Sequence, residues 1–397
     1  MLAGTTFRLR SSPGTFRLRS SQKRMKLIPN PETVIDSAVT AWDLLLGQGV
    51  ADLTRTSSSI IHEGPQCTVR RYRSRRRPRS DRSPVLLVPP LAAPATCFDL
   101  RRGCSLAEHL TALGYPTYLV DYGAISFSDR ALGLEHWVED VIPTAIRTVS
   151  EDSGGAQVQP VGWCLGGILT TLAVAGDPRL PVASVSMVAS PFDFTQVRML
   201  APIRRLAKLT GGALGTALYR AFGGAPAPLV SRGFQLTSID RLLTKPLFLA
   251  QNLHDRETIA HAEAVDDYMA HMFAYPGRTF GQLYHAFFRV NSLAGGKVEL
   301  RQGEEIDLAR VKVPVLSVAG NADVLAPEGA VRHIGALLPK APEVRLETAP
   351  GGHLGVLTGR SAIDTTWRHL DEFLARHDPL RSTGDALGAN GHAVRHA

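Results

Sequence analysis

The sequence predicts an α/β fold with a mostly parallel central sheet, helices on both faces and a helical cap insertion. The short apolar run at 85–88 ends in Pro89-Pro90, which is typical of a buried parallel strand, and a second expected strand at 158–161 runs into Gly162. Helical stretches separate these runs at short spacing, as crossover connections require. With 397 residues, of which 44% are hydrophobic, the chain can bury a substantial core.

The elements expected along the chain alternate between strand and helix. Strands are expected at 67–72, 85–88, 117–120, 158–161, 185–188, 315–318 and 344–347, and helices at 106–113, 134–149 and 168–173. Between about 190 and 290 the pattern is helical and irregular with many aromatic residues, which predicts a cap over the active site. We therefore expect a disordered basic extension at 1–30, one domain at 31–377 that includes the cap, and a disordered tail at 378–397.

The basic charge of the chain is concentrated in its N-terminal part. Residues 1–82 hold 16 Lys and Arg against 6 Asp and Glu, a net +10, while the remaining residues hold 28 against 30, a net −2. A nucleic-acid-binding domain spreads its basic residues over a folded face, so we expect no nucleic-acid partner. The eight arginines within 70–82 are interpreted as part of a solvated loop, with a site for phosphate, coenzyme A or anionic lipid as the alternative.

The first residues contain an internal repeat, because Thr-Phe-Arg-Leu-Arg-Ser-Ser occurs at 6–12 and again at 15–21. This stretch is rich in Arg and Ser and has no acidic residue before Glu32. It fits either a transit-like presequence or upstream sequence that precedes a natural start at Met25. Both interpretations predict a disordered segment.

The four cysteines, Cys67, Cys97, Cys104 and Cys164, are too few and too scattered for a disulfide framework. No C-x-x-C pair points to zinc, so we expect no metal and no cofactor. No run of about 18 or more uncharged apolar residues exists, so no transmembrane segment is expected. The pattern suits a cytoplasmic protein whose free thiols are available for chemistry.

Residues 162–166, Gly-Trp-Cys-Leu-Gly, have the form G-x-nucleophile-x-G, with a strand before them and an apolar helix after them. Such a nucleophile elbow holds its central residue, here Cys164, in a strained conformation above the carboxyl edge of the sheet. The start of the following helix favours a thiolate, and the N–H of Leu165 is placed to donate to an oxyanion. A buried structural thiol is the alternative, but the strand–turn–helix context favours a nucleophile.

A cysteine nucleophile needs a base, and this arrangement supplies partners in the chain order nucleophile, acid, histidine. Asp323 lies on the loop after a late strand, and His353 follows the last strand. Each residue alone has a structural interpretation, as a turn aspartate or a surface histidine. Their coincidence at strand ends in the required order favours a catalytic triad of Cys164, Asp323 and His353.

With these motifs the sequence resembles the polyhydroxyalkanoate synthases, especially their short forms, within the α/β-hydrolase superfamily. The family box is G-x-C-x-G-G, which 162–167 match, and the resemblance extends from about Pro84 to about Leu374. Further matches lie at 88–90, 105–108, 119–123, 190–194 and 291–293. Departures lie at 92–95, at 136–137 and at Val324, so the resemblance leaves the acyl group and the acceptor open.

The resemblance implies an acyltransferase that moves an acyl group from acyl-CoA, through a thioester on Cys164, to a hydroxyl acceptor. His353 would deprotonate the thiol and then assist the incoming hydroxyl. Asp323 would orient His353 or activate the acceptor hydroxyl. A second oxyanion donor is expected in the backbone near Leu91 or Ala92. Short synthases often need a second subunit, so a homodimer or a second subunit is a candidate partner.

Two other functions stay open at this point. A cysteine-nucleophile thioesterase or ester hydrolase on the same scaffold would use water as the acceptor of the acyl group. A non-catalytic scaffold or granule-binding protein would carry a vestigial triad, and the intact triad counts against it. An added alcohol distinguishes the acyltransferase from the hydrolase, because only a transferase passes the acyl group to the alcohol in place of water.

Overall fold

The computed structural model describes residues 31–380 except 48, 75–78, 80, 202–203, 205–223 and 226–238. The predictions for the extension at 1–30 and for the tail beyond 380 lie outside the described residues. At the C-terminal boundary the folded part reaches at least Asp378, one residue past the predicted end. The buried Asp378 carboxylate accepts hydrogen bonds from the Ser83 amide at 3.1 and 3.2 Å, which ties this end of the chain to the start of a central strand.

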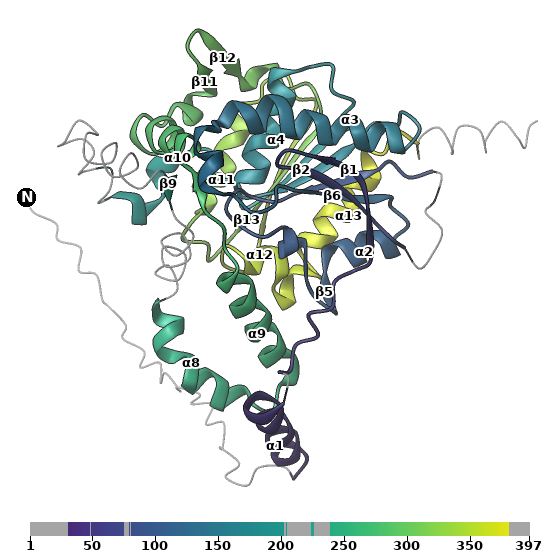
Figure 1. Cartoon of the computed structure of the whole chain (residues 1–397), viewed down its shortest axis with the longest axis vertical. Helices are drawn as coiled ribbons and strands as arrows, with labels where there is room; N and C mark the ends of the chain where they lie inside the picture. The colour runs from purple at the N-terminus through teal and green to yellow at the C-terminus, as the bar shows by residue number, and fades with distance from the viewer. Residues whose placement is uncertain are drawn as a thin grey trace, which may run out of the picture.

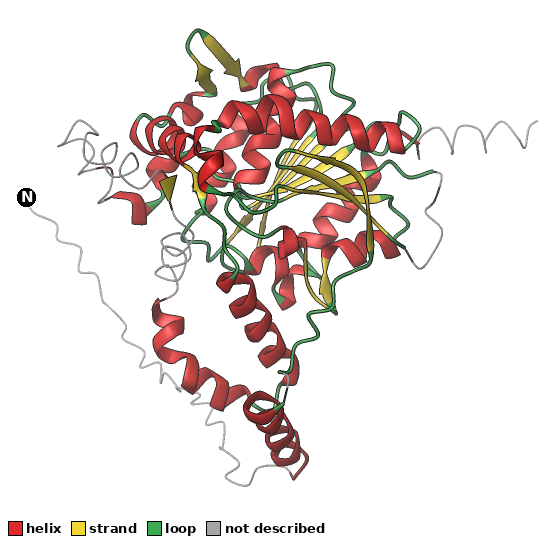
Figure 2. Ribbon diagram, in the orientation of Figure 1, coloured by secondary structure: helices red, strands yellow, loops and turns green. Residues whose placement is uncertain are grey.

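Eight strands form one central sheet in the order β1-β2-β6-β3-β7-β8-β13-β14 (Figure 1, Figure 2). Their bounds are β1 Ser58–Gly64, β2 Cys67–Tyr72, β3 Val85–Val88, β6 Thr117–Asp121, β7 Gln159–Trp163, β8 Val185–Val188, β13 Val315–Gly320 and β14 Val344–Ala349. β2 is antiparallel to β1 and β6, and the other pairings in this sheet are parallel. This order, with a sharp turn from β7 into a helix, confirms the expected α/β-hydrolase fold.

The sheet starts earlier in the chain than the sequence predicts. The first strand is expected at 67–72, but β1 precedes it and pairs with β2 as an antiparallel hairpin. β1 lies at the edge of the sheet, is at least partly exposed throughout, and shifts register between Ile60 and His62. A poorly buried edge strand needs little apolar alternation, so its pattern is weak in the sequence. Of the arginine-rich segment, 75–78 and 80 lie outside the described residues.

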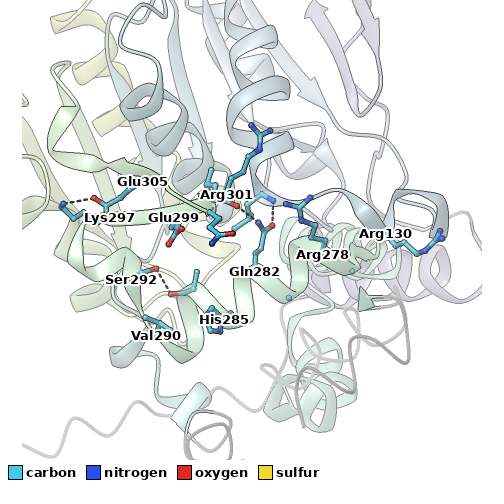
Figure 3. A pocket seen from close by; sticks show the side chains of 16 residues that line it. Arg130, Arg278, Gln282, His285, Val290, Ser292, Lys297, Glu299, Arg301 and Glu305 are labelled. Atoms are coloured by element: carbon cyan, nitrogen blue, oxygen red, sulfur yellow. Dashed lines mark hydrogen bonds and ion pairs between the residues drawn. The ribbon is translucent and has the colours of Figure 1, made fainter. Parts of the chain in front are cut away.

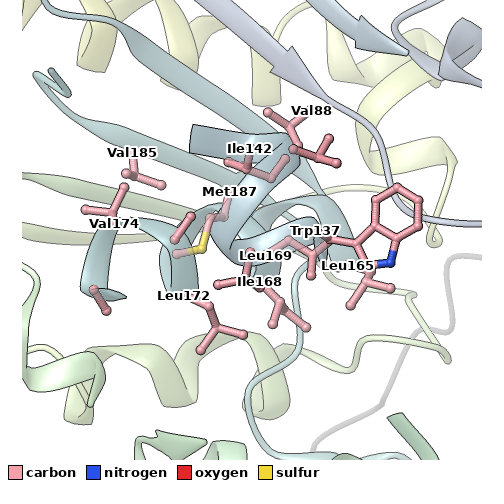
Figure 4. Close-up of a cluster of buried hydrophobic side chains, with 14 of the residues drawn as sticks. Val88, Trp137, Ile142, Leu165, Ile168, Leu169, Leu172, Val174, Val185 and Met187 are labelled. Atoms are coloured by element: carbon pink, nitrogen blue, oxygen red, sulfur yellow. The ribbon is translucent and has the colours of Figure 1, made fainter. Parts of the chain in front are cut away.

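Helices cover both faces of the sheet. On one face, α3 (Ile142–Asp152) and α4 (Leu165–Gly176) pack with Leu86 and Val88 of β3 (Figure 4). On the other face, α2 (Leu106–Ala112) and α13 (Thr366–Arg376) pack with Val85 and Leu87 of the same strand. Successive residues of β3 therefore serve opposite layers of the core, which explains why this strand is a continuous apolar run.

The helix expected at 134–149 consists of two parts. Residues His136–Val141 form a π-helical segment, η3, and α3 continues from Ile142. Pro143 accounts for the change, because proline has no N–H to donate and its ring crowds the carbonyl four residues earlier. One periodic pattern in the sequence therefore covers two backbone geometries.

Helix α4 is buried along nearly its whole length because it lies at the centre of one layer. Such a helix is apolar all round, yet its 12 residues are fewer than the roughly 20 that a bilayer requires. None of the helices in the described part of the chain has the length and apolar character of a membrane span. Gly166 allows α4 to start directly against β3, since a Cβ at this position would lie 2.2 Å from the Val88 carbonyl oxygen.

The insertion between β8 and β13 is helical where it is described. It contains α8 Ile239–Asn252, α9 Arg256–Ala270, α10 Gly277–Gln282, the π-helical η6 Leu283–Arg289, and a hairpin of β11 Lys297–Arg301 and β12 Glu304–Asp307. The hairpin extends the insertion past its expected end near 290. In Figure 1, α8 and α9 extend from the sheet toward α1 (Pro31–Leu46). The insertion also reaches the sheet edge, because the Phe273 amide donates to the Ala92 carbonyl at 2.9 Å.

We expect Gly166→Ala to lower the free energy of unfolding by about 1–3 kcal/mol, the usual cost of added atoms in a close-packed contact. The atoms that the new methyl group meets belong to the backbone of Val88 and Pro89, which cannot rotate away. Gly295→Ala is the matched control, because a Cβ there meets nothing within 4 Å. Urea unfolding of both variants measures the difference. Equal losses would contradict the close approach of α4 and β3.

Candidate active site

Cys164 is the single residue that joins β7 to α4. Its backbone angles, φ 53° and ψ −121°, are strained for a residue that carries a side chain. The Cys164 amide donates to the Val188 carbonyl at 2.9 Å, and the Ser190 hydroxyl donates to the Cys164 carbonyl at 2.7 Å. These two hydrogen bonds to the end of β8 hold the turn, so Cys164 has the elbow geometry that its motif predicts.

The glycines on either side of Cys164 are required by close packing. A Cβ at Gly162 would lie 2.5 Å from the Cα and the amide nitrogen of Gly167. The end of β7 and the start of α4 therefore touch through their backbones, which is the purpose of glycines in an elbow. This contact leaves Cys164 at the tip of the turn, at the carboxyl edge of the sheet.

Asp323 lies on the loop after β13, as the sequence predicts. Its side chain is 0% exposed, and Oδ1 accepts hydrogen bonds from the Leu325 and Ala326 amides, both at 2.8 Å. Its Oδ2 lies 2.7 Å from Nδ1 of His353. A carboxylate held in this way orients the imidazole and keeps a proton on Nδ1, so that Nε2 serves as the reacting nitrogen.

His353 follows β14 and links Asp323 to Cys164. Burial of this side chain, which is 10% exposed, opposes the charged imidazolium. Attraction to Cys164 and Asp323, with hydrogen bonds to both, outweighs burial and raises the pKa of His353 above its usual value. An imidazolium beside the sulfur favours the thiolate, which is the nucleophilic form of cysteine. The fold therefore brings all three residues of the predicted triad together.

Two backbone amides, those of Leu165 and Ala92, are the predicted oxyanion donors. Leu165 opens α4, and the first amides of a helix have no acceptor within that helix. Ala92 lies in the loop after β3 with φ 62°, an uncommon conformation for alanine, and its carbonyl is held by the Phe273 amide. Strained backbone of this kind occurs at functional sites. The oxyanion role of both amides stays a prediction.

Four further side chains that were not predicted to be functional lie beside the triad: Trp163, Cys97, Tyr268 and Tyr275. The indole Nε1 of Trp163 donates to the His353 carbonyl at 3.1 Å, and the two ring centroids are 5.2 Å apart. The other three each interact electrostatically with Cys164. Trp163 lies within the elbow motif, where its position signals a role. The other three come from distant segments that only the fold brings to the site.

An open pocket of about 800 Å³ lies between the α10–η6 segment and the β11–β12 hairpin (Figure 3). None of the three triad residues lines it. Three of its cations have carboxylate partners, in the pairs Arg278–Glu135, Arg301–Glu139 and Lys297–Glu305. The pocket is therefore separate from the proposed chemistry and a weak candidate for anion binding. In the described residues no group of three or more His, Cys, Asp or Glu is arranged as metal ligands.

Comparison with curated proteins finds relatives named poly(3-hydroxyalkanoate) polymerase subunit PhaC. One from Haloferax mediterranei is 23% identical over 379 residues, covering 92% of this chain and 72% of the relative. One from Allochromatium vinosum is 25% identical and covers 81% of this chain and 91% of the relative. One from Synechocystis sp. is 28% identical and covers 69% and 72%. The resemblance to polyhydroxyalkanoate polymerases is confirmed.

No family model matches the chain. Solved structures similar to this one include a thermophilic esterase from Thermogutta terrifontis, with 12% identity, a TM-score of 0.45, and 82% and 99% of the two chains covered. Another is mouse alpha/beta hydrolase domain-containing protein 10, with 13% identity, a TM-score of 0.45, and 81% and 99% covered. The fold is assigned from the strand order and the elbow, and the likeness to the polymerases rests on sequence.

We expect Asp323→Asn to slow alkylation of Cys164 by iodoacetamide at pH 7. The substitution removes a charge and a hydrogen bond that raise the pKa of His353, so that pKa falls and the neutral imidazole no longer favours the thiolate. A loss of about 1.4 kcal/mol in the interaction between the imidazolium and the thiolate corresponds to a rate about tenfold lower. Mass spectrometry of the Cys164 peptide measures the rate, and the other three cysteines are buried.

Asp371→Asn is the matched control for this measurement. It removes the carboxylate of a second His–Asp pair, in which Nε2 of His109 lies 2.9 Å from Asp371. That pair lies at the contact between α2 and α13, so the variant should react at the unchanged rate. Equal rates for Asp323→Asn and the unchanged protein would show that Asp323 does not activate the thiol through His353.

Proposed function

We propose that this chain is an acyltransferase of the polyhydroxyalkanoate-synthase type. It moves an acyl group from acyl-CoA through a thioester on Cys164 to a hydroxyl acceptor. The observation that carries the proposal is the cysteine in a strained elbow, linked through His353 to the buried Asp323. The polymerase names of the relatives support this choice of acyl donor and acceptor.

In the first half-reaction the Cys164 thiolate attacks the carbonyl carbon of the acyl-CoA thioester. The amides of Leu165 and Ala92 stabilise the oxyanion that forms. The C–S bond to coenzyme A breaks, and His353 gives its proton to the departing coenzyme A thiolate. Exchange between two thioesters is nearly isoenergetic, so the acyl group stays activated on the enzyme.

In the second half-reaction the neutral His353 takes the proton of an acceptor hydroxyl, whose oxygen attacks the Cys164 thioester. The C–S bond to Cys164 breaks and an oxygen ester forms. The proton held by His353 restores the thiolate–imidazolium pair, and Asp323 stabilises the charged imidazole throughout. The same steps with water as the acceptor would give hydrolysis, so the acceptor decides the reaction class.

Aromatic side chains around the sulfur favour transfer over hydrolysis. Trp163 and Tyr268 are buried, and their rings lie side by side with centroids 6.4 Å apart and planes tilted by 55°. Tyr275, from the cap, also interacts with Cys164. Apolar rings next to a thioester leave little space for water and strengthen the electrostatic interactions within the site. This environment supports an organic hydroxyl group as the acceptor.

We also infer that the active form is an assembly and that it works in the cytoplasm. The relatives are named as polymerase subunits, which supports a second copy or a second subunit as partner. All four cysteines are free thiols, which fits a reducing compartment where acyl-CoA is available.

Incubation with 3-hydroxybutyryl-CoA should release coenzyme A and add a 3-hydroxybutyryl group to the Cys164 peptide. Oligomeric esters should then accumulate, because the hydroxyl of one unit attacks the thioester of another. Mass spectrometry detects the peptide adduct and the products. Cys164→Ala should abolish both, since it removes the nucleophile, whereas Cys67→Ala should retain both because Cys67 lies in β2. Absence of acylation with any acyl-CoA would overturn the proposed substrate class.

An added alcohol such as glycerol should divert the acyl group from water to the alcohol. In a transferase, His353 takes the proton of the alcohol while the alcohol oxygen attacks the Cys164 thioester. The ratio of ester to free acid should therefore rise with alcohol concentration. Chromatography of the products measures this ratio, with Cys164→Ala as the background. A ratio that does not change with alcohol concentration would identify the protein as a cysteine hydrolase.

A further inference from the structure

Tyr268 brings a hydroxyl group from the cap to the nucleophile. It lies in the last turns of α9, where its side chain is 2% exposed. Its ring lies beside that of Trp163, the residue before the nucleophile, with centroids 6.4 Å apart and the planes tilted by 55°. Tyr268 also interacts electrostatically with Cys164 and with Cys97. The side chain therefore belongs to the surroundings of the sulfur, although its helix is part of the insertion.

The hydroxyl of Tyr268 is buried without a well-formed hydrogen bond to any described residue. It interacts with the thiol of Cys97, which is a weak hydrogen-bonding group. Two other buried tyrosines are satisfied: Tyr118 donates to Asp152 at 2.7 Å, and Tyr122 donates to the Pro89 carbonyl at 3.1 Å. A buried donor without a partner is costly, and phenylalanine would fill the same space without that cost.

The Tyr268 hydroxyl is suited to act as a donor. Burial raises the pKa of Tyr268 well above its usual value, so the group stays neutral and keeps its proton. The carbonyl oxygen of an acyl group on Cys164 already has two backbone donors in the expected oxyanion site. The oxygen that still needs a partner is therefore one carried further along the acyl chain.

We propose that the Tyr268 hydroxyl donates a hydrogen bond to an oxygen substituent on the acyl chain bound to Cys164. This inference rests on the proposed function and deepens it, because it makes Tyr268 a specificity-determining residue for hydroxyacyl thioesters. A site that hydrogen-bonds a substrate oxygen rejects the analogue that lacks it, since the buried donor then stays unpaired.

The test compares 3-hydroxybutyryl-CoA with butyryl-CoA, which differ only in the hydroxyl group. Rapid-quench mass spectrometry gives the acylation rate of Cys164 with each thioester, in the unchanged protein, in Tyr268→Phe and in Tyr118→Phe. Thermal unfolding gives the Tm of each. Tyr118→Phe is the matched control, because it removes a buried hydroxyl that has partners in the fold, Asp152 and Ser153.

The unchanged protein should react faster with the hydroxyacyl thioester. Tyr268→Phe should reduce this preference about fivefold, as expected for one lost hydrogen bond. The acylation rate should fall with the hydroxyacyl thioester and stay unchanged with butyryl-CoA. Its Tm should stay nearly unchanged, because among the described residues the hydroxyl interacts only weakly, with the Cys97 thiol. Tyr118→Phe should show the opposite pattern, with a lower Tm and an unchanged preference.

A retained preference in Tyr268→Phe, or an equal loss of rate with both thioesters, would overturn the inference while leaving the acyltransferase proposal intact. A marked fall in its Tm would overturn it too, because the hydroxyl would then have a partner within the fold. If the unchanged protein is acylated by neither thioester, the proposed function fails and this inference fails with it.

Discussion

The backbone contact between the end of β7 and the start of α4 is the constraint on which the site depends. Gly162 and Gly167 touch, and Gly166 lies against the carbonyls at the end of β3. Because no side chain fits at these points, the chain reverses over one residue, and that residue is Cys164. The strain of its left-handed backbone is compensated by hydrogen bonds to the end of β8. The most tightly packed part of the core thus directs the sulfur out of the sheet edge.

The other two residues of the proposed triad depend on parallel strands that end at the same edge. β13 and β14 are neighbours in the sheet, so the loops that follow them lie side by side. These loops are joined directly: the Ala322 amide donates to the Gly351 carbonyl, and the Gly351 amide donates to the Asn321 side chain, both at 3.1 Å. This link holds Asp323 and His353 at hydrogen-bond distance before any substrate binds, which is the preorganisation that proton transfer needs.

The insertion adds the parts that distinguish this site from a bare elbow. Phe273 fixes the carbonyl of Ala92, while Tyr268 and Tyr275 interact electrostatically with Cys164. The cap therefore combines the burial that limits water with a hydroxyl group, that of Tyr268, which lacks a well-formed hydrogen bond to any described residue. We therefore expect the cap to select among acyl chains. The residues at the sheet edge are expected to make and break the bonds.

The sequence by itself determined the fold class and the candidate triad, because both rest on local patterns. Buried parallel strands are continuous apolar runs, and an elbow requires glycines at fixed spacing around its nucleophile. The edge strand β1 was not predicted, because a poorly buried strand shows little apolar alternation. The π-helical segment before Pro143 was not predicted either, because its apolar residues follow the same helical period as those of α3. Only the tertiary structure decided which side chains surround Cys164. Cys97, Tyr268 and Tyr275 reach it through contacts between distant segments, and such contacts leave no periodicity or spacing in the chain.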